Sequence, residues 1–258
     1  MENKKGLIVL IVILVLISLG SVGYIVYDKF IAKSDEEKEY ITVINDASID
    51  VNKLYKVGDI LNTFDTAFGT NDSKYLGYIY NVEKLEVKDF DKNVAIYASI
   101  YPSLVRSNTE QTISNEMVKN KYESIFGRTL EYKPSNLDLG DNIKVEYDET
   151  NKVYKYKASI TNNEHQSEYL VKNIKTKLQD DLVIITRKVF YVEYSGISAV
   201  IFKDSSRSTR IGTVKLQNGE VSLEEVTGKF GSKLNTYEYT FKLGSDDEYN
   251  FYKIERTK

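Results

Sequence analysis

The feature that most constrains this chain is an uncharged apolar run near its N-terminal end. Residues 6–27, GLIVLIVILVLISLGSVGYIVY, contain no Asp, Glu, Lys or Arg. A helix over Leu7 to Tyr27 would be about 31 Å long at 1.5 Å per residue, close to the roughly 30 Å hydrocarbon thickness of a bilayer. A helix also satisfies its own backbone hydrogen bonds, as lipid requires. The run therefore predicts a transmembrane helix over residues 6–27, with the lipid bilayer as its partner.

The charges on either side of the run predict its orientation. Lys4 and Lys5 precede it, and the acidic sequence SDEEKE at 34–39 follows at a distance. Basic residues favour the cytoplasmic side. We therefore expect a single-pass signal anchor in the cell membrane, with residues 1–5 as a cytoplasmic tail and the rest of the chain outside.

The downstream chain divides into two parts. Residues 28–49 are polar and predict a stalk or linker, and residues 50–258 predict an extracytoplasmic domain, with a sub-boundary near 128–140 as the one internal division that the pattern suggests.

Two alternatives to an anchor stay open. The small residues of Ser18-Leu19-Gly20 and Ser21-Val22-Gly23 would suit cleavage of a signal peptide, but the apolar run is longer than the usual 7–15 residues. A buried core helix is the other alternative, although a helix that is apolar on every face needs a larger protein around it.

Composition excludes several chemistries. The chain has no cysteine, which removes disulfides, thiolate metal sites and a cysteine nucleophile. Residues 28–258 hold 33 basic and 37 acidic residues, a net charge of −4, so no basic excess predicts a nucleic-acid partner.

Three helices are predicted between residues 50 and 127. The segment 50–69 has an apolar stripe at three- and four-residue steps that ends at Gly69. This stripe, Leu54 to Phe68, would pack on the protein's own sheet or against a partner helix. The segment 89–101 predicts a second helix that is broken near Pro102, and 113–127 a third, with Ser114 as its cap and Gly127 as its stop.

Beyond residue 127 the hydrophobic period changes from that of a helix to two. Nine segments alternate or are rich in β-branched and aromatic residues, at 129–133, 143–148, 153–160, 169–178, 182–194, 198–203, 212–216, 236–243 and 249–255. Turn clusters separate most of them, including Asn218-Gly219, a type I′ hairpin signal. Helices followed by strands predict an α+β fold, with about three helices on a curved antiparallel sheet in a cystatin-like or NTF2-like arrangement.

Several of these signatures together resemble those of uncharacterised single-span extracytoplasmic proteins of low-GC Gram-positive bacteria. The residues that carry the resemblance are Lys4-Lys5, Tyr27-Asp28-Lys29, Tyr122 with Ile125-Phe126-Gly127, Tyr147-Asp148 with Asn151-Lys152-Val153-Tyr154, and Tyr239-Thr240-Phe241-Lys242 with Tyr249 and Phe251. These are cap, turn and strand signatures. The resemblance implies a location in the bacterial cell envelope and a fold, and it carries no assigned function and no catalytic residue.

No catalytic, metal or cofactor residues are predicted. The single histidine, His165, lies in a polar, turn-like segment, and no serine has the sequence context of an activated nucleophile. GSDDEY at 244–249 predicts a hairpin turn, because it lacks the alternating oxygen ligands of a calcium loop. The glycines of TGKFGSK, Gly228 and Gly231, predict a turn and not a phosphate-binding loop.

The one functional signal lies in pairs of tyrosines. Tyr78 and Tyr80, Tyr154 and Tyr156, and Tyr237 and Tyr239 would each share one face of a strand. Exposed, such rows would bind glycans or peptides, and buried, they would be sheet core. Tyr154, Tyr156, Tyr237 and Tyr239 are the candidate ligand-facing residues.

The sequence thus favours a membrane-anchored, non-enzymatic binding or assembly module whose partner is an envelope protein or polymer. The alternative is a cell-envelope hydrolase that uses a carboxylate pair, which would need two facing acids in a cleft, one with a raised pKa.

Overall fold

The computed structural model describes residues 51–70, 73–105, 107, 109–139, 143–158 and 167–258. Within them lie four α-helices and eleven strands. The helices are α4 (Val51–Gly69), α5 (Lys92–Ile100), α6 (Asn115–Phe126) and α7 (Leu223–Phe230), and short 3₁₀ turns lie at η1 (Val87–Asp89), η2 (Tyr101–Ser103) and η3 (Gly231–Lys233).

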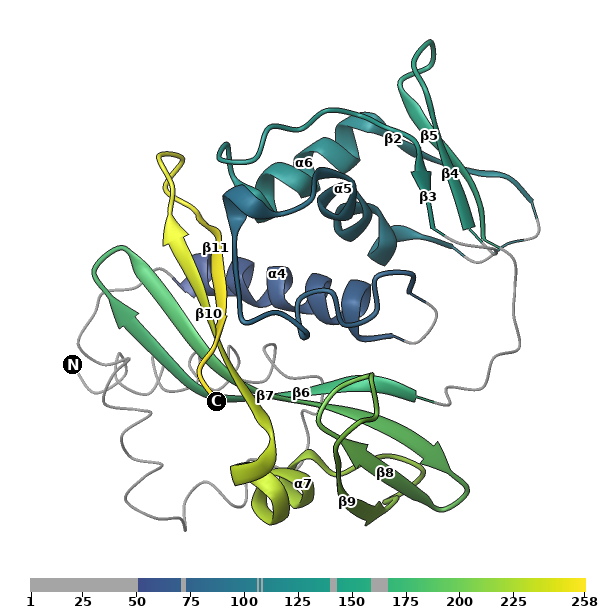
Figure 1. Ribbon diagram of the computed structural model, residues 1–258. Coiled ribbons are helices and arrows are strands. Elements are labelled where there is room, and N and C mark those ends of the chain that lie inside the picture. The colour runs from purple at the N-terminus through teal and green to yellow at the C-terminus, as the bar shows by residue number, and fades with distance from the viewer. Residues whose placement is uncertain (1–50, 71–72, 106, 108, 140–142, 159–166) are drawn as a thin grey trace, which may run out of the picture.

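The strands form two antiparallel sheets (Figure 1). Sheet A contains β1 (Lys84–Glu86), β6 (Ser167–Gln179), β7 (Leu182–Ser195), β8 (Ser198–Phe202), β9 (Arg210–Lys215), β10 (Asn235–Leu243) and β11 (Tyr249–Arg256). Sheet B contains β2 (Gln111–Ser114), β3 (Leu137–Asp138), β4 (Ile143–Asp148) and β5 (Val153–Ala158), in the order β2-β5-β4-β3.

Strand β7 is the centre of sheet A. Along one side it pairs with β6 over almost its whole length, from Leu182 to Glu193. Along the other side it pairs first with β10 and then with β8. Because successive side chains of a strand point to opposite faces, β7 divides its residues between two cores.

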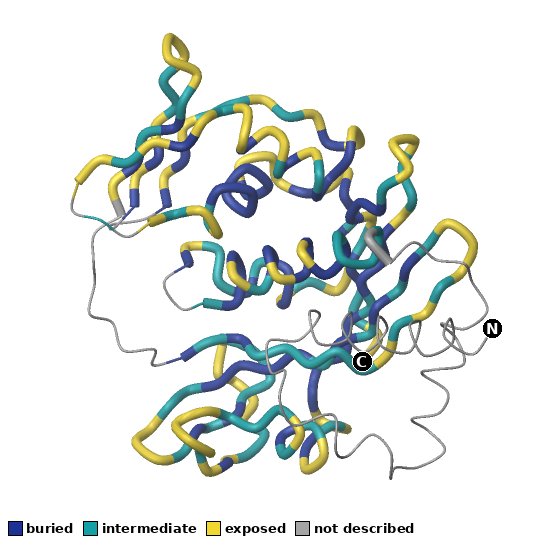
Figure 2. Tube along the Cα trace, turned by 180° about the vertical axis from the view of Figure 1, so that it is seen from behind, coloured by how far each residue is buried: buried dark blue, intermediate teal, exposed yellow. Residues whose placement is uncertain are grey.

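The larger core lies between the inner face of sheet A, helices α4 to α6 and sheet B. Val183, Ile185, Val189 and Tyr191 of β7 enter it. From α4 come Val57, Leu61, Phe64 and Phe68, each at most 2% exposed. The predicted apolar stripe therefore packs on the protein's own sheet, and Figure 2 shows the buried residues concentrated along these helices and strands.

The smaller core lies on the opposite, outer face of sheet A. Phe190 and Val192 of β7 enter it and meet Val226 and Phe230 of α7. Figure 1 shows α7 and α4 on opposite sides of β6 and β7. Helix α7 therefore covers only one end of the outer face.

The three predicted helices are confirmed, and so is the predicted cap at Ser114. The Asp91 carboxylate accepts hydrogen bonds from the amides of Asn93 and Val94 at the start of α5, and Ser114 Oγ accepts one from the amide of Met117 at the start of α6. Gly127 ends α6 with a φ of 61°, a left-handed conformation that favours glycine.

The α+β class is confirmed, but some details of the prediction are wrong. The strands form two sheets, where the prediction had one. Residues 129–133 form no strand, because Leu130 is packed into the core from an irregular connection after α6. Residues 78–80 lie in a turn, so Tyr78 and Tyr80 are not a strand pair.

Helix α7 is absent from the prediction, which assigned TGKFGSK to a turn. Gly228 lies inside this helix. The missed signal is Ser222 followed by Glu225, the pattern of a helix cap, and Ser222 Oγ accepts a hydrogen bond from the Glu225 amide at 3.2 Å.

Two predicted segments, the transmembrane helix at 6–27 and the stalk at 28–49, lie outside the described residues. Among the residues that are described, none of the helices is both long enough and apolar enough to span a bilayer.

The contact between α7 and β9 generates a stability prediction. A Cβ atom on Gly212 of β9 would lie 2.7 Å from Cε1 of Phe230, so Gly212→Ala must displace a ring that fills the smaller core. We expect it to lower the free energy of unfolding by about 1–3 kcal/mol, measured by urea titration with circular dichroism.

The matched control is Gly228→Ala, on an open side of α7 where the new methyl group meets no atom within 4 Å. Alanine favours the helix by roughly 0.5–1 kcal/mol over glycine. Equal effects of the two substitutions would contradict the packing of Phe230 on Gly212.

Candidate functional site

The most polar group inside the larger core surrounds Arg187 of β7. Alternation along β7 places this arginine on the inner face between Ile185 and Val189. Its side chain is 3% exposed and makes a bidentate ion pair with Asp65 of α4, with Nη1–Oδ1 and Nη2–Oδ2 distances of 2.9 and 2.5 Å. The pair joins the central strand of sheet A to the first described helix.

Neighbouring side chains complete this group. Nε of Arg187 donates to Oδ1 of Asn173 on β6 at 2.8 Å, and the Tyr80 hydroxyl donates to Oδ1 of Asp65 at 2.7 Å. The guanidinium carbon of Arg187 lies 5.2 Å from the centre of the Tyr239 ring, a cation–π contact. The Tyr239 hydroxyl is buried and has no hydrogen-bond partner among the described residues.

The electrostatics keep the arginine charged and the phenols neutral. Burial alone would lower the pKa of Arg187, but the Asp65 carboxylate outweighs it, and the net pKa is raised. Burial, followed by the nearby Asp65, raises the pKa of Tyr80 well above its ordinary value. Burial likewise raises the pKa of Tyr239. Both phenols are therefore neutral at neutral pH, and that of Tyr80 acts as a hydrogen-bond donor to Asp65.

The four predicted ligand-facing tyrosines are all buried. Tyr154, Tyr237 and Tyr239 are 0% exposed and Tyr156 is 3% exposed. The first pair belongs to sheet B and the second to sheet A, so the structure does not bring the four together at one surface. Of the two possibilities, a ligand-binding row or a row in the sheet core, the burial of these tyrosines agrees with the core.

Their hydroxyl groups are used inside the protein. The Tyr154 and Tyr132 hydroxyls are 2.9 Å apart, the Tyr156 hydroxyl accepts from the amide of Val105, and the Tyr237 hydroxyl donates to the carbonyl of Tyr80. The signal that favours burial is the lysine between Tyr154 and Tyr156, because it places a charge on the other face of the strand.

The acidic turn at 244–249 holds the β10–β11 hairpin against α4. Asp247 makes an ion pair with Lys53 at 2.6 Å, and Glu248 makes one with Lys56 at 3.3 Å. In the part of the chain that the structure describes, no three His, Asp or Glu side chains gather in a metal-binding group. His165 lies outside that part.

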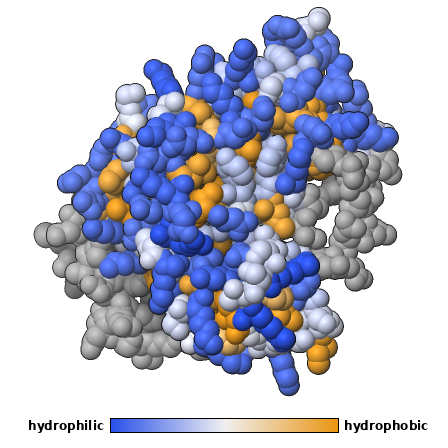
Figure 3. Space-filling view, viewed as in Figure 1, coloured by the Kyte–Doolittle hydropathy of each residue, from blue (hydrophilic) through white to orange (hydrophobic). Residues whose placement is uncertain are grey.

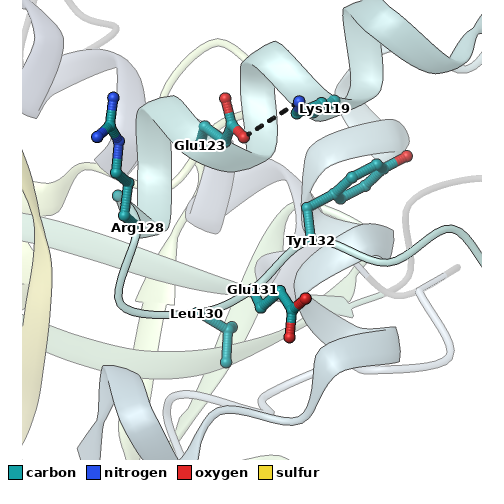
Figure 4. Close-up of a pocket in the computed structure, with 7 residues that line it drawn as sticks. Lys119, Glu123, Arg128, Leu130, Glu131 and Tyr132 are labelled. Atoms are coloured by element: carbon teal, nitrogen blue, oxygen red, sulfur yellow. Dashed lines mark ion pairs between the residues drawn. The ribbon is translucent and has the colours of Figure 1, made fainter.

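A surface cavity of about 250 Å³ lies where α6 ends and the next connection begins, and it is lined by Lys119, Glu123, Gly127, Arg128, Leu130, Glu131 and Tyr132. Glu123 is paired with Lys119 at 3.7 Å. Figure 4 shows the Glu123 and Glu131 side chains pointing in different directions. The two acids therefore do not face each other across this cavity, as a carboxylate-pair mechanism requires.

Among the residues that the structure describes, the carboxyl groups with clearly shifted pKa values are shifted downward. Lys84 and Lys88 lower the pKa of Glu86 to about 2, and Lys155 together with Asn151 lowers that of Asp148. Lys253 lowers the pKa of Glu255. A general acid needs a shift in the opposite direction.

Exposed apolar residues are scattered over the surface. Among the described large hydrophobic side chains, Val105, Met117, Ile197 and Tyr252 are exposed, and they belong to four separate segments. Figure 3 shows one face of the molecule, on which hydrophobic atoms form small groups between hydrophilic ones.

Comparison of the chain with protein-family models, curated proteins and solved structures finds no match.

The Asp65–Arg187 pair generates a second prediction. Arg187→Met leaves the Asp65 carboxylate without its cationic partner. Because breaking a buried pair leaves an uncompensated charge, we expect a loss of about 3 kcal/mol in the free energy of unfolding, measured by urea titration.

The control is the double variant Asp65→Leu with Arg187→Met, which removes both charges and should recover most of that loss. A single variant as stable as the unaltered protein would show that the pair contributes nothing to α4 docking.

Proposed function

We propose that this protein is a membrane-anchored, extracytoplasmic binding or assembly module of the bacterial cell envelope. The observation that carries the proposal is the uncharged run at residues 6–27 with Lys4 and Lys5 before it. From this run follow the bilayer as a partner and the orientation with the N-terminus in the cytoplasm. The polar residues 28–49 after it would then form the stalk.

The arrangement of polar groups in the folded part supports a non-enzymatic role. The buried Arg187 is paired with the partly buried Asp65, and the acidic hairpin turn is paired with lysines of α4. These groups hold elements together and leave binding to the outer surface. A cystatin-like or NTF2-like arrangement of the α+β domain is part of this proposal.

The absence of cysteine from the chain makes the topology directly testable. Ile197 is 82% exposed in the turn between β7 and β8, so Ile197→Cys should react with a membrane-impermeant maleimide in intact cells. Asn3→Cys, the matched control, should react only after lysis.

Labelling of Asn3→Cys but not of Ile197→Cys in intact cells would reverse the orientation and overturn the proposal. Release of the labelled Ile197→Cys protein into the medium, shortened at its N-terminus, would indicate a cleaved signal peptide.

Binding and hydrolysis are separated by a second experiment. We expect the full chain, in nonionic detergent, to co-sediment with isolated envelope polymer without releasing soluble fragments from it. Glu123→Gln and Glu131→Gln together should leave the retained fraction unchanged. If the unaltered protein releases soluble fragments and the two substitutions abolish that release, the hydrolase alternative is favoured instead.

A further inference from the structure

The outer face of sheet A carries a row of lysines beside the area that α7 covers. The register pairs Lys172, Lys175 and Lys177 of β6 with Lys188, Thr186 and Ile184 of β7. Directly opposite residues share a face. Because Arg187 and Ile185 enter the inner core, these partners and the three lysines lie on the outer face.

Lys172 and Lys188 are directly opposite each other, an arrangement of like charges that destabilises a sheet. Lys188 Nζ donates to Oγ1 of Thr236 at 2.7 Å, and Lys188 makes no ion pair with any described residue. Lys172 reaches Oε1 of Glu224 at 3.2 Å, but this carboxylate is 76% exposed, so the pair is weak.

A further lysine lies at the end of the chain. The Lys258 carbonyl accepts a hydrogen bond from the amide of Thr236, the residue opposite Lys188 on β10. Burial, followed by the charge of Lys258, lowers the pKa of Lys188. Lys172 in the middle of β6, Lys188 in the middle of β7 and Lys258 beside the start of β10 therefore form one cationic group across these strands.

Protection of a sheet edge accounts for only part of this pattern. Strand β6 is an edge strand with a bulge between Asn173 and Lys175, and lysines on such an edge oppose unwanted pairing. Lys188 lies on β7, between β6 and β10. An interior strand needs no such protection. Edge protection therefore does not explain why Lys188 lies there without an ion pair.

The charges of the neighbouring strands do not neutralise the group. Lys242 is paired with Asp181, and Lys253 with Glu255. Glu238 of β10 shares the outer face, but in the described structure it makes no ion pair with the lysines of β6, with Lys188 or with Lys258. The group stands out because residues 28–258 as a whole carry a net charge of −4, from 33 basic and 37 acidic residues.

We propose that these five residues, Lys172, Lys175, Lys177, Lys188 and Lys258, form a binding surface for a linear phosphate-bearing polymer. The lysines from 172 to 177 span four steps of the β7 register, from Lys188 to Ile184, or about 13 Å at 3.3 Å per residue. A row of this length suits repeated anions better than a single ion. Lysine binds phosphate as a point charge on a flexible stem, so the surface would recognise charge spacing and not a particular monomer.

This surface deepens the proposed function by naming the class of envelope polymer, and it rests on that function for its location outside the membrane. The binding test below does not depend on orientation, whereas the labelling of Ile197→Cys does. Failure of one experiment is therefore distinguishable from failure of the other.

The test uses the full chain in nonionic detergent with fluorescently labelled long-chain inorganic polyphosphate as the probe, followed by fluorescence polarisation. Lys172→Gln with Lys188→Gln should weaken binding at least tenfold. The matched control is Lys144→Gln with Lys157→Gln, two exposed lysines that also face each other, but on sheet B. This control removes the same charge and should change binding less than twofold.

Salt dependence gives an independent readout. If about four lysines contact phosphates, the logarithm of the association constant should fall with the logarithm of salt concentration with a slope of about −3. In Lys172→Gln with Lys188→Gln, two phosphate contacts are lost, so the slope should become shallower by about half. In the control variant the slope should stay unchanged.

A fold control accompanies these measurements. Removing two opposed like charges should leave the melting temperature of Lys172→Gln with Lys188→Gln unchanged or higher, so its loss of binding would not reflect unfolding. The proposal is overturned if polyphosphate does not bind, if both double variants lose affinity equally, or if poly-L-glutamate binds as tightly as polyphosphate.

Discussion

The packing of α4 on the inner face of sheet A is the contact on which the rest of the structure depends. Phe64 lies at its centre, fully buried, with ring centres of Phe90, Phe126 and Phe251 at 6.2, 6.2 and 5.1 Å. One side chain of α4 thus touches the connection before α5, the end of α6 and strand β11. Burial of each such ring stabilises the fold by roughly 1.5–3 kcal/mol, and the elements are held together through it.

Within this contact, the Asp65–Arg187 pair supplies what apolar packing lacks, which is direction. Aromatic and aliphatic side chains tolerate small shifts between a helix and a sheet, whereas a bidentate pair is satisfied in one geometry. Asn173 and Tyr80 bond to the remaining positions of the pair. The cost of burying Arg187 and partly burying Asp65 is offset because their partners are present, so we interpret the pair as a determinant of how α4 is placed.

The inner face of sheet A is buried by this packing, so a binding partner can contact only the outer surface. The tyrosine rows that the sequence offered as ligand-facing residues are part of the core, where their rings fill space and most of their hydroxyl groups bond to other side chains or to the backbone. The lysines of β6 and β7 lie on the opposite face of sheet A. Alternation along β7 therefore separates the structural chemistry of Arg187 from the binding chemistry that we propose for Lys188, one residue further on.

The sequence by itself determined the elements whose causes are local. The cap at Ser114, the glycine at 127, the apolar stripe of 50–69 and the alternation of β7 depend on neighbouring residues. Such local patterns predicted three of the four described helices, most of the long strands and the α+β class. The fourth helix also had a local signal, at Ser222 and Glu225, so its omission was a failure of interpretation.

Only the tertiary structure decided how the strands divide into two sheets, which faces are covered, and which charges meet. Asp65 and Arg187 are 122 residues apart in the chain, and Lys172 faces Lys188 only through the register of a hairpin with a bulge. Partners at such separations are selected by the packing of whole elements. No local pattern of residues specifies them, and for that reason neither the buried pair nor the lysine row could be predicted from the sequence.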